Sequence, residues 1–163
     1  MSMNYRNRAF PILAVAFVFA LSSAATPVFS QTNENAVINS FIVREAKKAG
    51  AGEYKKARNV VRGDLNGDGK PDLAVLYTLE GFGGGNSYAQ YLAVFLRSGK
   101  TFRFAANSVV GGKLNRDMDL RSIAAGKINF DTMNYAKNDP ACCPTRKGKT
   151  RFTLVRGKLK EIR

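Results

Sequence analysis

The segment that decides the fold is Asp64-Leu65-Asn66-Gly67-Asp68-Gly69-Lys70-Pro71-Asp72, which runs directly into the apolar residues 73–79. Residues 73–79 read Leu-Ala-Val-Leu-Tyr-Thr-Leu, so both sets of alternating positions are largely apolar. A strand with this pattern is normally covered on both of its faces. We therefore expect residues 73–79 to form a central, buried strand that the chain enters through a tight polar loop.

Patterns on either side of this strand predict one helix and six or seven strands. Residues 33–49 carry apolar side chains near helical spacing and are followed by Gly50, which favours an amphipathic helix. Strand patterns occur at residues 59–62, 73–79, 88–96, 101–105, 127–135, 150–155 and 159–162. Residues 97–100 and 156–158 are typical of hairpin turns. We predict an α+β fold, with an N-terminal helix packed on a mainly antiparallel meander sheet that is either open or curled towards a small barrel.

The loop at residues 64–72 places oxygen-bearing side chains at alternate positions. Side-chain oxygens occur at loop positions 1, 3, 5 and 9, from Asp64, Asn66, Asp68 and Asp72. Lys70 at position 7 has a backbone carbonyl to offer, and Gly69 at position 6 allows the positive φ that a tight wrap needs. Calcium, which accepts about six to eight oxygens in a flexible geometry, suits this pattern better than octahedral magnesium.

The loop differs from an EF-hand at position 12, where Val75 replaces the bidentate Glu and a strand replaces the second helix. We therefore expect weak, structural calcium binding, with a Kd on the order of 10⁻⁴–10⁻³ M. The alternative is a turn that needs no ion, because Asn66-Gly67 and Asp68-Gly69 are both strong hairpin signals. Three carboxylates in alternate register repel one another without a cation, which favours the calcium site.

Residues 64–75, with Gly63 before them, resemble the D-x-N-x-D-G-x-x-D-L-A-V segment of FG-GAP/VCBS-type repeats. In that family the motif is a calcium loop that leads into a β-strand, often in adhesins and other exported bacterial proteins. The resemblance implies the calcium ligands Asp64, Asn66, Asp68, Lys70 and Asp72. The motif occurs once in this sequence, so the resemblance does not imply the multi-bladed propeller of the integrin kind.

The first 30 residues have the pattern of a secretory signal peptide. Arg6 and Arg8 precede an apolar run at residues 9–21, and small residues follow at 22–25. The run is shorter than the roughly 20 residues that cross a bilayer, so we expect no stable transmembrane span, with an uncleaved anchor as the alternative. We predict cleavage after Ala25 or Ser30, one mature domain at residues 31–163, and a periplasmic or extracellular location.

The chain is strongly basic, with a net charge of +14, and removal of residues 1–30 would take away two Arg and no acid, leaving +12. Residues 146–163 hold eight Lys or Arg against a single Glu. This excess favours anionic partners such as a polysaccharide, lipid headgroups or a peptidoglycan-type polymer, although a basic surface also serves solubility alone. We do not expect nucleic acid as a partner, because we expect the protein to be exported and strand alternation should turn Phe102 and Phe104 into the core, away from Arg103.

The sequence contains no His. This absence excludes Ser-His-Asp and Cys-His nucleophile systems and the common zinc hydrolase sites. Asp117, Asp119 and Asp131 are the remaining candidates for a glycosidase carboxylate pair, and we expect residues 115–119 to form a polar loop. We predict that the protein is not an enzyme, with an enzyme inhibitor or a His-free hydrolase of the cell envelope as the alternative.

Two further segments have unusual composition. Residues 81–87, Gly-Phe-Gly-Gly-Gly-Asn-Ser, are either a flexible hairpin loop with an exposed Phe82 or a cradle of backbone N–H groups for an anion. Residues 139–144, Asp-Pro-Ala-Cys-Cys-Pro, resemble a D-P-x-C-C-P stretch of small exported bacterial proteins. Their adjacent cysteines, Cys142 and Cys143, leave a vicinal disulfide, an intermolecular disulfide and free thiols open. We favour a structural role for this loop, because C-x-x-C spacing is absent.

Together these patterns predict an exported, non-enzymatic binding or structural domain. It has one weak Ca²⁺ loop and a basic face for anionic envelope polymers.

Overall fold

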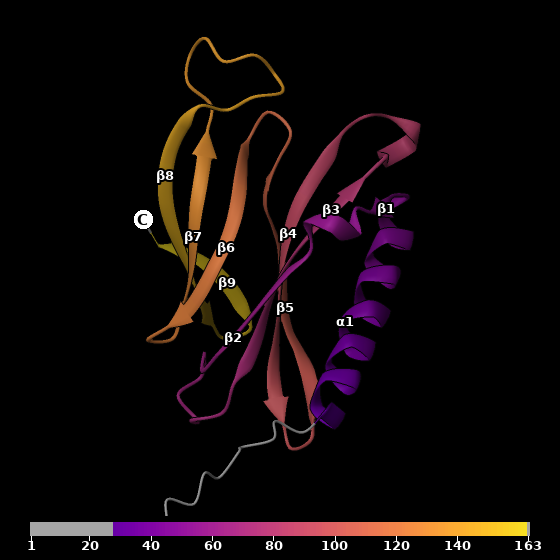
Figure 1. The fold of residues 1–163 in the computed structure, drawn as a ribbon, viewed down its shortest axis with the longest axis vertical. Coiled ribbons are helices and arrows are strands. Elements are labelled where there is room, and N and C mark those ends of the chain that lie inside the picture. The colour runs from indigo at the N-terminus through magenta and orange to yellow at the C-terminus, as the bar shows by residue number, and fades with distance from the viewer. Residues whose placement is uncertain (1–27, 163) are drawn as a thin grey trace, which may run out of the picture.

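The computed structural model describes residues 28–162 (Figure 1). The predicted leader lies almost entirely outside these residues, and the second predicted cleavage point, after Ser30, falls in the first turn of the helix. In the described part of the chain, no helix is both long enough and apolar enough to cross a membrane.

One α-helix precedes nine strands in the described residues. The elements are α1 (Val28–Ala49), β1 (Gly52–Glu53), β2 (Asn59–Gly63), β3 (Asp72–Glu80), β4 (Tyr88–Ser98), β5 (Thr101–Gly112), β6 (Arg116–Ala124), β7 (Lys127–Asn134), β8 (Arg146–Val155) and β9 (Lys158–Ile162). Two short 3₁₀ turns lie at Lys55–Ala57 and Phe82–Gly84. All pairings are antiparallel, in the order β1-β3-β4-β5-β6-β7-β8-β9, and β2 pairs with the other end of the β3 edge.

The sheet divides into two halves where β5 meets β6. These strands pair only at Gly112 and Arg116, next to the turn that joins them. Beyond this point β6–β9 fold across one face of β2–β5, and the side chain of Asn59 in β2 donates to the carbonyl of Leu120 in β6 at 2.8 Å. The expected α+β class is correct in outline, but the sheet dominates and does not close into a barrel.

The helix α1 covers the outer face of the first half-sheet, as Figure 1 shows. Ile38, Phe41 and Ile42 of α1 are buried against one set of alternating residues of β3 and β4. The ring of Phe41 meets the ring of Phe95 edge-on, with 5.3 Å between centroids. The helix begins at Val28, earlier than the predicted start at residue 33, and it ends at Ala49 as predicted.

A second core fills the space between the two half-sheets. Its buried side chains come from both halves and from the loop before β3: Leu65, Ala74, Leu76, Leu92, Val94, Val110, Met118, Leu120, Ile128, Phe130 and Phe152. Strand β3 therefore contributes to both cores, Leu73, Val75, Tyr77 and Leu79 to the first and Ala74 and Leu76 to the second. This double coverage explains why β3 is apolar at almost every position and confirms that it is a central strand.

The structure corrects the sequence prediction in the middle of the chain. Residues 116–119 belong to strand β6 and are not a polar loop, and β5 continues to Gly112, well beyond residue 105. Phe102 is buried as expected, but Phe104 is 45% exposed. Phe104 lies at the margin of the helix-covered face, where it stacks on Phe41 with 4.9 Å between ring centroids.

Three tyrosines of the first half-sheet are expected to resist ionisation. Burial raises the pKa of Tyr77, Tyr88 and Tyr91 above the ordinary value, and the hydrogen bond from Tyr88 to Asp117 adds to the effect at Tyr88. Because the folded pKa exceeds the unfolded one, this contribution to stability is complete below about pH 10 and is lost as the pH rises above it. Spectrophotometric titration should show these three phenols ionising only together with loss of the far-UV dichroism signal. Ionisation of every tyrosine near pH 10 with an intact dichroism spectrum would contradict this packing.

Candidate metal centre

The loop at residues 64–72 joins β2 to β3 and lies against the turn between β6 and β7. Its entry is tight, because a Cβ atom at Gly63 would lie 2.6 Å from the Cβ of Ile123 in β6. Only a glycine allows β2 and β6 to approach this closely. Leu65, the second loop residue, is buried in the core between the half-sheets and anchors the loop to the fold.

Asp64 organises the turn by accepting hydrogen bonds from three loop amides. Its Oδ1 accepts from the N–H groups of Asn66 (3.2 Å) and Gly67 (2.7 Å), and its Oδ2 accepts from Gly69 (2.8 Å). The Gly69 amide is the main cause of a lowered Asp64 pKa, and the amides of Gly67 and Asn66 add to it. Gly67 and Gly69 have φ values of +81° and +75°, which favour glycine at both positions.

Asn66 and Asp68 continue the same pattern one step further along the loop. The Oδ1 of Asn66 accepts from the Asp68 amide at 3.0 Å, and the Oδ1 of Asp68 accepts from the Lys70 amide at 2.9 Å. The side-chain amide of Asn66 donates to Oδ2 of Asp68 at 3.2 Å. The structure thus brings Asp64, Asn66 and Asp68 into one hydrogen-bonded turn, with Lys70 attached through its backbone.

Asp72 has a different position from the other predicted ligands, because its side chain is fully buried at the base of the loop. Its Oδ2 accepts from the Leu65 amide at 2.9 Å and its Oδ1 from the Arg97 amide at 2.8 Å. None of the ion pairs among the described residues involves Asp72. Asp72 therefore ties the start of the loop and the end of β4 to the start of β3.

These oxygens retain acceptor capacity beyond the hydrogen bonds that they make. An ionised carboxylate has about four acceptor sites, and an amide oxygen has two. Asp64 uses three such sites and keeps one, and Asp68, Asp72 and the amide oxygen of Asn66 also each keep at least one free of the hydrogen bonds described above. Within residues 28–162, no three or more His, Cys, Asp or Glu side chains form a ready-made metal cluster. Oxygen donors of this kind and charge suit one hard cation. In the structure, the aspartates accept hydrogen bonds from backbone amides.

A hollow of about 540 Å³ lies beside the loop. Asp64 and Gly67 form one wall, and the β6–β7 turn at residues 123–126 forms the other. Position 12 of the motif, Val75, is fully buried in the first core and offers no side-chain oxygen. The loop therefore has a free side towards solvent, next to the turn of the second half-sheet.

The two cysteines form a disulfide with each other, at the tip of the β7–β8 connection. The loop around them is ordered by Asp139, whose carboxylate accepts from the amides of Ala136 (2.7 Å) and Thr145 (2.8 Å) and from the Thr145 hydroxyl. These amide hydrogen bonds, with that of Ala136 the strongest, lower the pKa of Asp139. Of the three states left open by the sequence, the structure contains the vicinal disulfide.

The three carboxylates considered for glycoside hydrolysis lie together on the outer face of β6 and β7. Asp117, Asp119 and Asp131 line one hollow of about 370 Å³. The guanidinium of Arg121 pairs with both Asp119 and Asp131 at 2.8 Å, and Asp117 accepts from Tyr88. A glycosidase needs one protonated and one ionised carboxyl facing the bond to be cleaved. Two carboxylates that share one guanidinium do not have this division of roles.

The glycine-rich connection at residues 81–87 uses its amides internally. The N–H groups of Gly81, Gly84 and Gly85 donate to the carbonyls of Ser87, Gly81 and Phe82. Phe82 is partly buried against the first core, which corrects the expectation that it is exposed. Because three amides of the loop already donate within the loop, the structure favours the hairpin-loop interpretation over the anion cradle.

Two partners of the loop, Arg97 and Ile123, were not predicted from the sequence. The Arg97 amide bonds to Asp72 across 25 residues of sequence, and a backbone donor leaves no trace in side-chain patterns. Ile123 contacts Gly63 from β6, a strand that was not predicted from the sequence. The glycine directly before the motif was the available signal for this close approach.

Comparisons with known proteins support the resemblance in this region. A family model described as the FG-GAP repeat matches residues 57–95, from the 3₁₀ turn before β2 through the loop and β3 to Phe95 in β4. Comparisons with curated proteins and with solved structures give no match. The matched range includes every predicted ligand and covers less than half of the chain. Residues 57–95 are therefore a single FG-GAP-type segment, a structural or binding unit set into a larger antiparallel sheet.

Proposed function

We propose that this protein is an exported, non-enzymatic binding domain of the periplasm or exterior. In this proposal, loop 64–72 holds one Ca²⁺ ion and the basic surface binds anionic envelope polymers. Asp64, Asn66 and Asp68 would hold the ion through their side chains, Lys70 through its carbonyl, and Asp72 from the base of the loop. The ion would supply positive charge and a fixed geometry, and it takes part in no reaction.

The observation that supports the calcium site best is the burial of Asp72 at the base of a loop that carries two further aspartates, Asp64 and Asp68. A carboxylate removed from water is costly unless it is hydrogen-bonded and its charge is compensated. Two amides satisfy its oxygens, but no described Lys or Arg side chain forms an ion pair with Asp72, Asp64 or Asp68. A divalent cation in the loop offsets the repulsion among the three carboxylates.

A cation at this position would stabilise the fold more than it would change it. The loop already connects β2 to β3, reaches β4 through Asp72 and faces the β6–β7 turn. The same amide network would hold the oxygens in place before the ion arrives. This is the behaviour of a structural ion of weak affinity, suited to a compartment where calcium is abundant.

The proposal of an anionic polymer partner rests on charge. The residues after the predicted leader carry 24 Lys and Arg against 12 Asp and Glu. Several of the acids are already paired inside the fold, as in Glu53 with Arg58 and Glu161 with Arg116. The excess of exposed cations favours a polyanion, and the absence of His together with the paired carboxylates of β6 and β7 favours binding over catalysis.

Calcium is expected to raise the melting temperature of metal-stripped protein. With a Kd on the order of 10⁻⁴–10⁻³ M, about 10 mM Ca²⁺ should add about 1.4–2.7 kcal/mol to the free energy of unfolding. For a domain of this size the melting temperature should rise by about 4–10 °C. Asp68→Ala should abolish the rise, because it removes a carboxylate of the turn. Thermal melts followed by circular dichroism, with and without calcium, measure this effect.

Asp119→Ala is the matched control for this experiment. It removes the same charge from an exposed position in β6, where Asp119 pairs with Arg121 and is not one of the predicted ligands. The control variant should keep the full calcium response. Equal melting temperatures of the unaltered protein with and without calcium, or an equal response in Asp68→Ala, would contradict the proposed site.

A further inference from the structure

The outer face of β8 and β9 carries a concentration of positive charge. Alternate residues of these two paired strands point away from the second core, and they include five cations: Lys147, Lys149, Arg151, Lys158 and Lys160. We call this set the β8–β9 basic face. All five residues are exposed, and no Asp or Glu of β8 or β9 lies among them.

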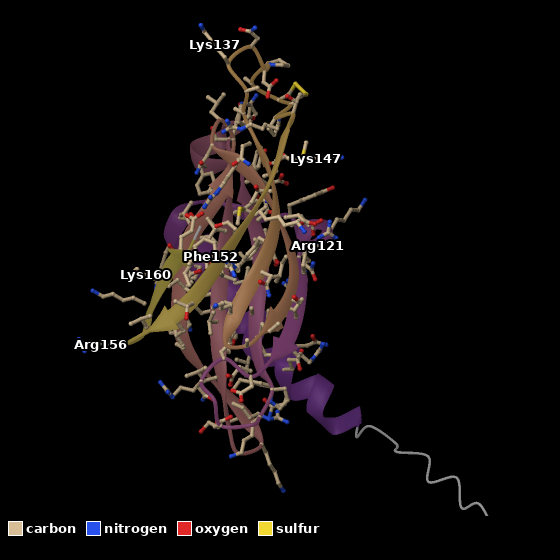
Figure 2. All side chains as sticks on the ribbon, turned by 90° about the vertical axis from the view of Figure 1, so that its left-hand side faces the viewer. Arg121, Lys137, Lys147, Phe152, Arg156 and Lys160 are labelled. Atoms are coloured by element: carbon tan, nitrogen blue, oxygen red, sulfur yellow. A yellow bond between two sulfur atoms is a disulfide. The ribbon has the colours of Figure 1, made fainter. Side chains whose placement is uncertain are left out.

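The register of the two strands fixes the direction of these side chains. Phe152 of β8 is buried in the core between the half-sheets, and Leu159 of β9 packs against that core. Glu161, the only acid of β9, pairs with Arg116 and accepts from Thr150, which is itself buried. The other set of alternating positions, which includes the five cations, therefore faces solvent. Figure 2 shows Lys160 extending away from β9, whereas Phe152 lies within the body of the protein.

The cations of this face are largely uncompensated, whereas several arginines elsewhere in the fold have carboxylate partners. Arg58, Arg62 and Arg116 each pair with a glutamate. On the β8–β9 basic face, the described residues provide only one ion pair, a 3.9 Å contact between Lys149 and Asp131. That aspartate is shared with Arg121, whose guanidinium lies 2.8 Å away. The face therefore keeps a net positive charge that its neighbours do not cancel.

A trough runs alongside this row of cations. The hollow of about 370 Å³ that contains the three aspartates and a second hollow of about 650 Å³ share Arg121, Asp131 and Lys149 in their walls. The second hollow also reaches Arg151 and Ile162. Together they form a continuous depression across β6, β7 and β8, long in the direction of the strands. The depression offers room for the uncharged part of a ligand next to its charged groups.

We infer that the β8–β9 basic face binds one extended anionic glycan, which lies along β8 with its acidic groups on the cations and its sugar rings towards the trough. This inference rests on the anionic polymer binding proposed above and assigns it to one surface. Side chains at alternate strand positions are about 6.6 Å apart, so Lys147, Lys149 and Arg151 present a row of charges with a regular spacing. A linear polymer with a charge on each repeat complements such a row.

A lipid surface fits this face less well than a polymer does. Peripheral membrane binding uses apolar side chains that enter the bilayer beside the cations. Among the described residues, the exposed large hydrophobics lie mostly on other elements, and only Val155 borders this face. The binding of anionic vesicles in preference to a polymer is therefore the competing outcome that the experiment below distinguishes.

The test uses purified protein, fluorescently labelled polygalacturonate and, separately, vesicles of phosphatidylcholine with phosphatidylglycerol. The site variant combines K147Q, K149Q and R151Q, and the control variant combines K47Q, K55Q and K56Q, which remove three exposed charges from α1 and the following turn. We expect the site variant to bind the polymer at least tenfold more weakly at low salt. By counterion release, the slope of log K against log salt should fall by about 2. The affinity of the control variant for the polymer should stay within about threefold of that of the unaltered protein, because the charges that it removes are distant from the face and screened by salt.

Each other result has a distinct meaning. Equal losses in the site and control variants would overturn the assignment to this face while leaving polymer binding in place. Absence of polymer binding by the unaltered protein would overturn both this inference and the proposed polymer partner. Tight binding to vesicles without binding to polygalacturonate would overturn the glycan in favour of a lipid surface. A charge-conserving variant with K147R, K149R and R151K should restore binding, which separates loss of charge from misfolding.

Discussion

Replacement of Asp72 by alanine is expected to lower the free energy of unfolding by about 3 kcal/mol or more, even in the presence of a chelator. The carboxylate is fully buried and accepts hydrogen bonds from the amides of Leu65 and Arg97. Its removal leaves both N–H groups buried without an acceptor, and it disconnects the loop from the end of β4. Urea unfolding of the two proteins at low calcium measures the difference directly.

Asp72→Asn is the informative companion variant. Asparagine keeps one acceptor oxygen but places an NH₂ group where the second amide donates, so one hydrogen bond is lost and a donor faces a donor. We expect Asp72→Asn to lower the free energy of unfolding by less than Asp72→Ala does. If Asp72→Ala unfolds at the same urea concentration as the unaltered protein, Asp72 does not hold the loop and β4 together.

Substitution of Gly63 by alanine is expected to cost about 1–3 kcal/mol, because it forces β2 and β6 apart. The added methyl group would lie 2.6 Å from Cβ and 2.7 Å from Cγ2 of Ile123, and 3.0 Å from the carbonyl oxygen of the same residue. Part of this contact is with backbone, so a change of side-chain rotamer alone does not relieve it. Equilibrium unfolding in urea measures the loss.

The double variant Gly63→Ala with Ile123→Ala isolates this contact. Truncation of Ile123 to alanine removes Cγ2, which would lie 2.7 Å from the added methyl group, whereas Cβ and the carbonyl oxygen remain. Loss of the larger side chain also allows a small shift of β6. The combined loss of stability should therefore be smaller than the sum of the two single losses, which is the sign of direct coupling. Strict additivity would show that the side chain of Ile123 beyond Cβ is not what constrains residue 63.

The first half of the fold was predictable because its signals are local. The run of apolar residues in β3 is dictated by coverage on both faces, and the sequence shows both alternating sets directly. The hairpin at residues 97–100 contains Gly99, whose φ of +59° explains why a glycine occurs there. The turn that joins Asp64, Asn66 and Asp68 was predictable for the same reason, because these residues are close together in the sequence.

The second half was predicted less well because its order depends on contacts between distant residues. Arg116, Asp117 and Asp119 give β6 a polar appearance, yet their side chains alternate with the buried Met118 and Leu120. The sheet remains open because β5 and β6 pair at a single position before they diverge, and no local pattern encodes that divergence. The role of Asp72 was equally hidden, because one of its two partners is a backbone amide at the end of β4.

The basic C-terminal region was recognised from its composition, but the way its charges are arranged was not. Composition alone did not distinguish a solvated surface from a binding face. The pairing of β8 with β9 places five of the cations on one side and turns Glu161 inward towards Arg116. Strand alternation separates these charges, and this pattern is present in the sequence. Its recognition required the correct start of β8, which is Arg146 and not the predicted residue 150.

The claim that loop 64–72 closes around calcium is tested most directly by calorimetric titration of metal-stripped protein with Ca²⁺ and, separately, with Mg²⁺. We predict one Ca²⁺ site with a Kd on the order of 10⁻⁴–10⁻³ M, weaker binding of Mg²⁺, and no Ca²⁺ site in Asp68→Ala. The absence of a saturable Ca²⁺ signal at concentrations well above this range, or an undiminished signal in Asp68→Ala, would contradict the account.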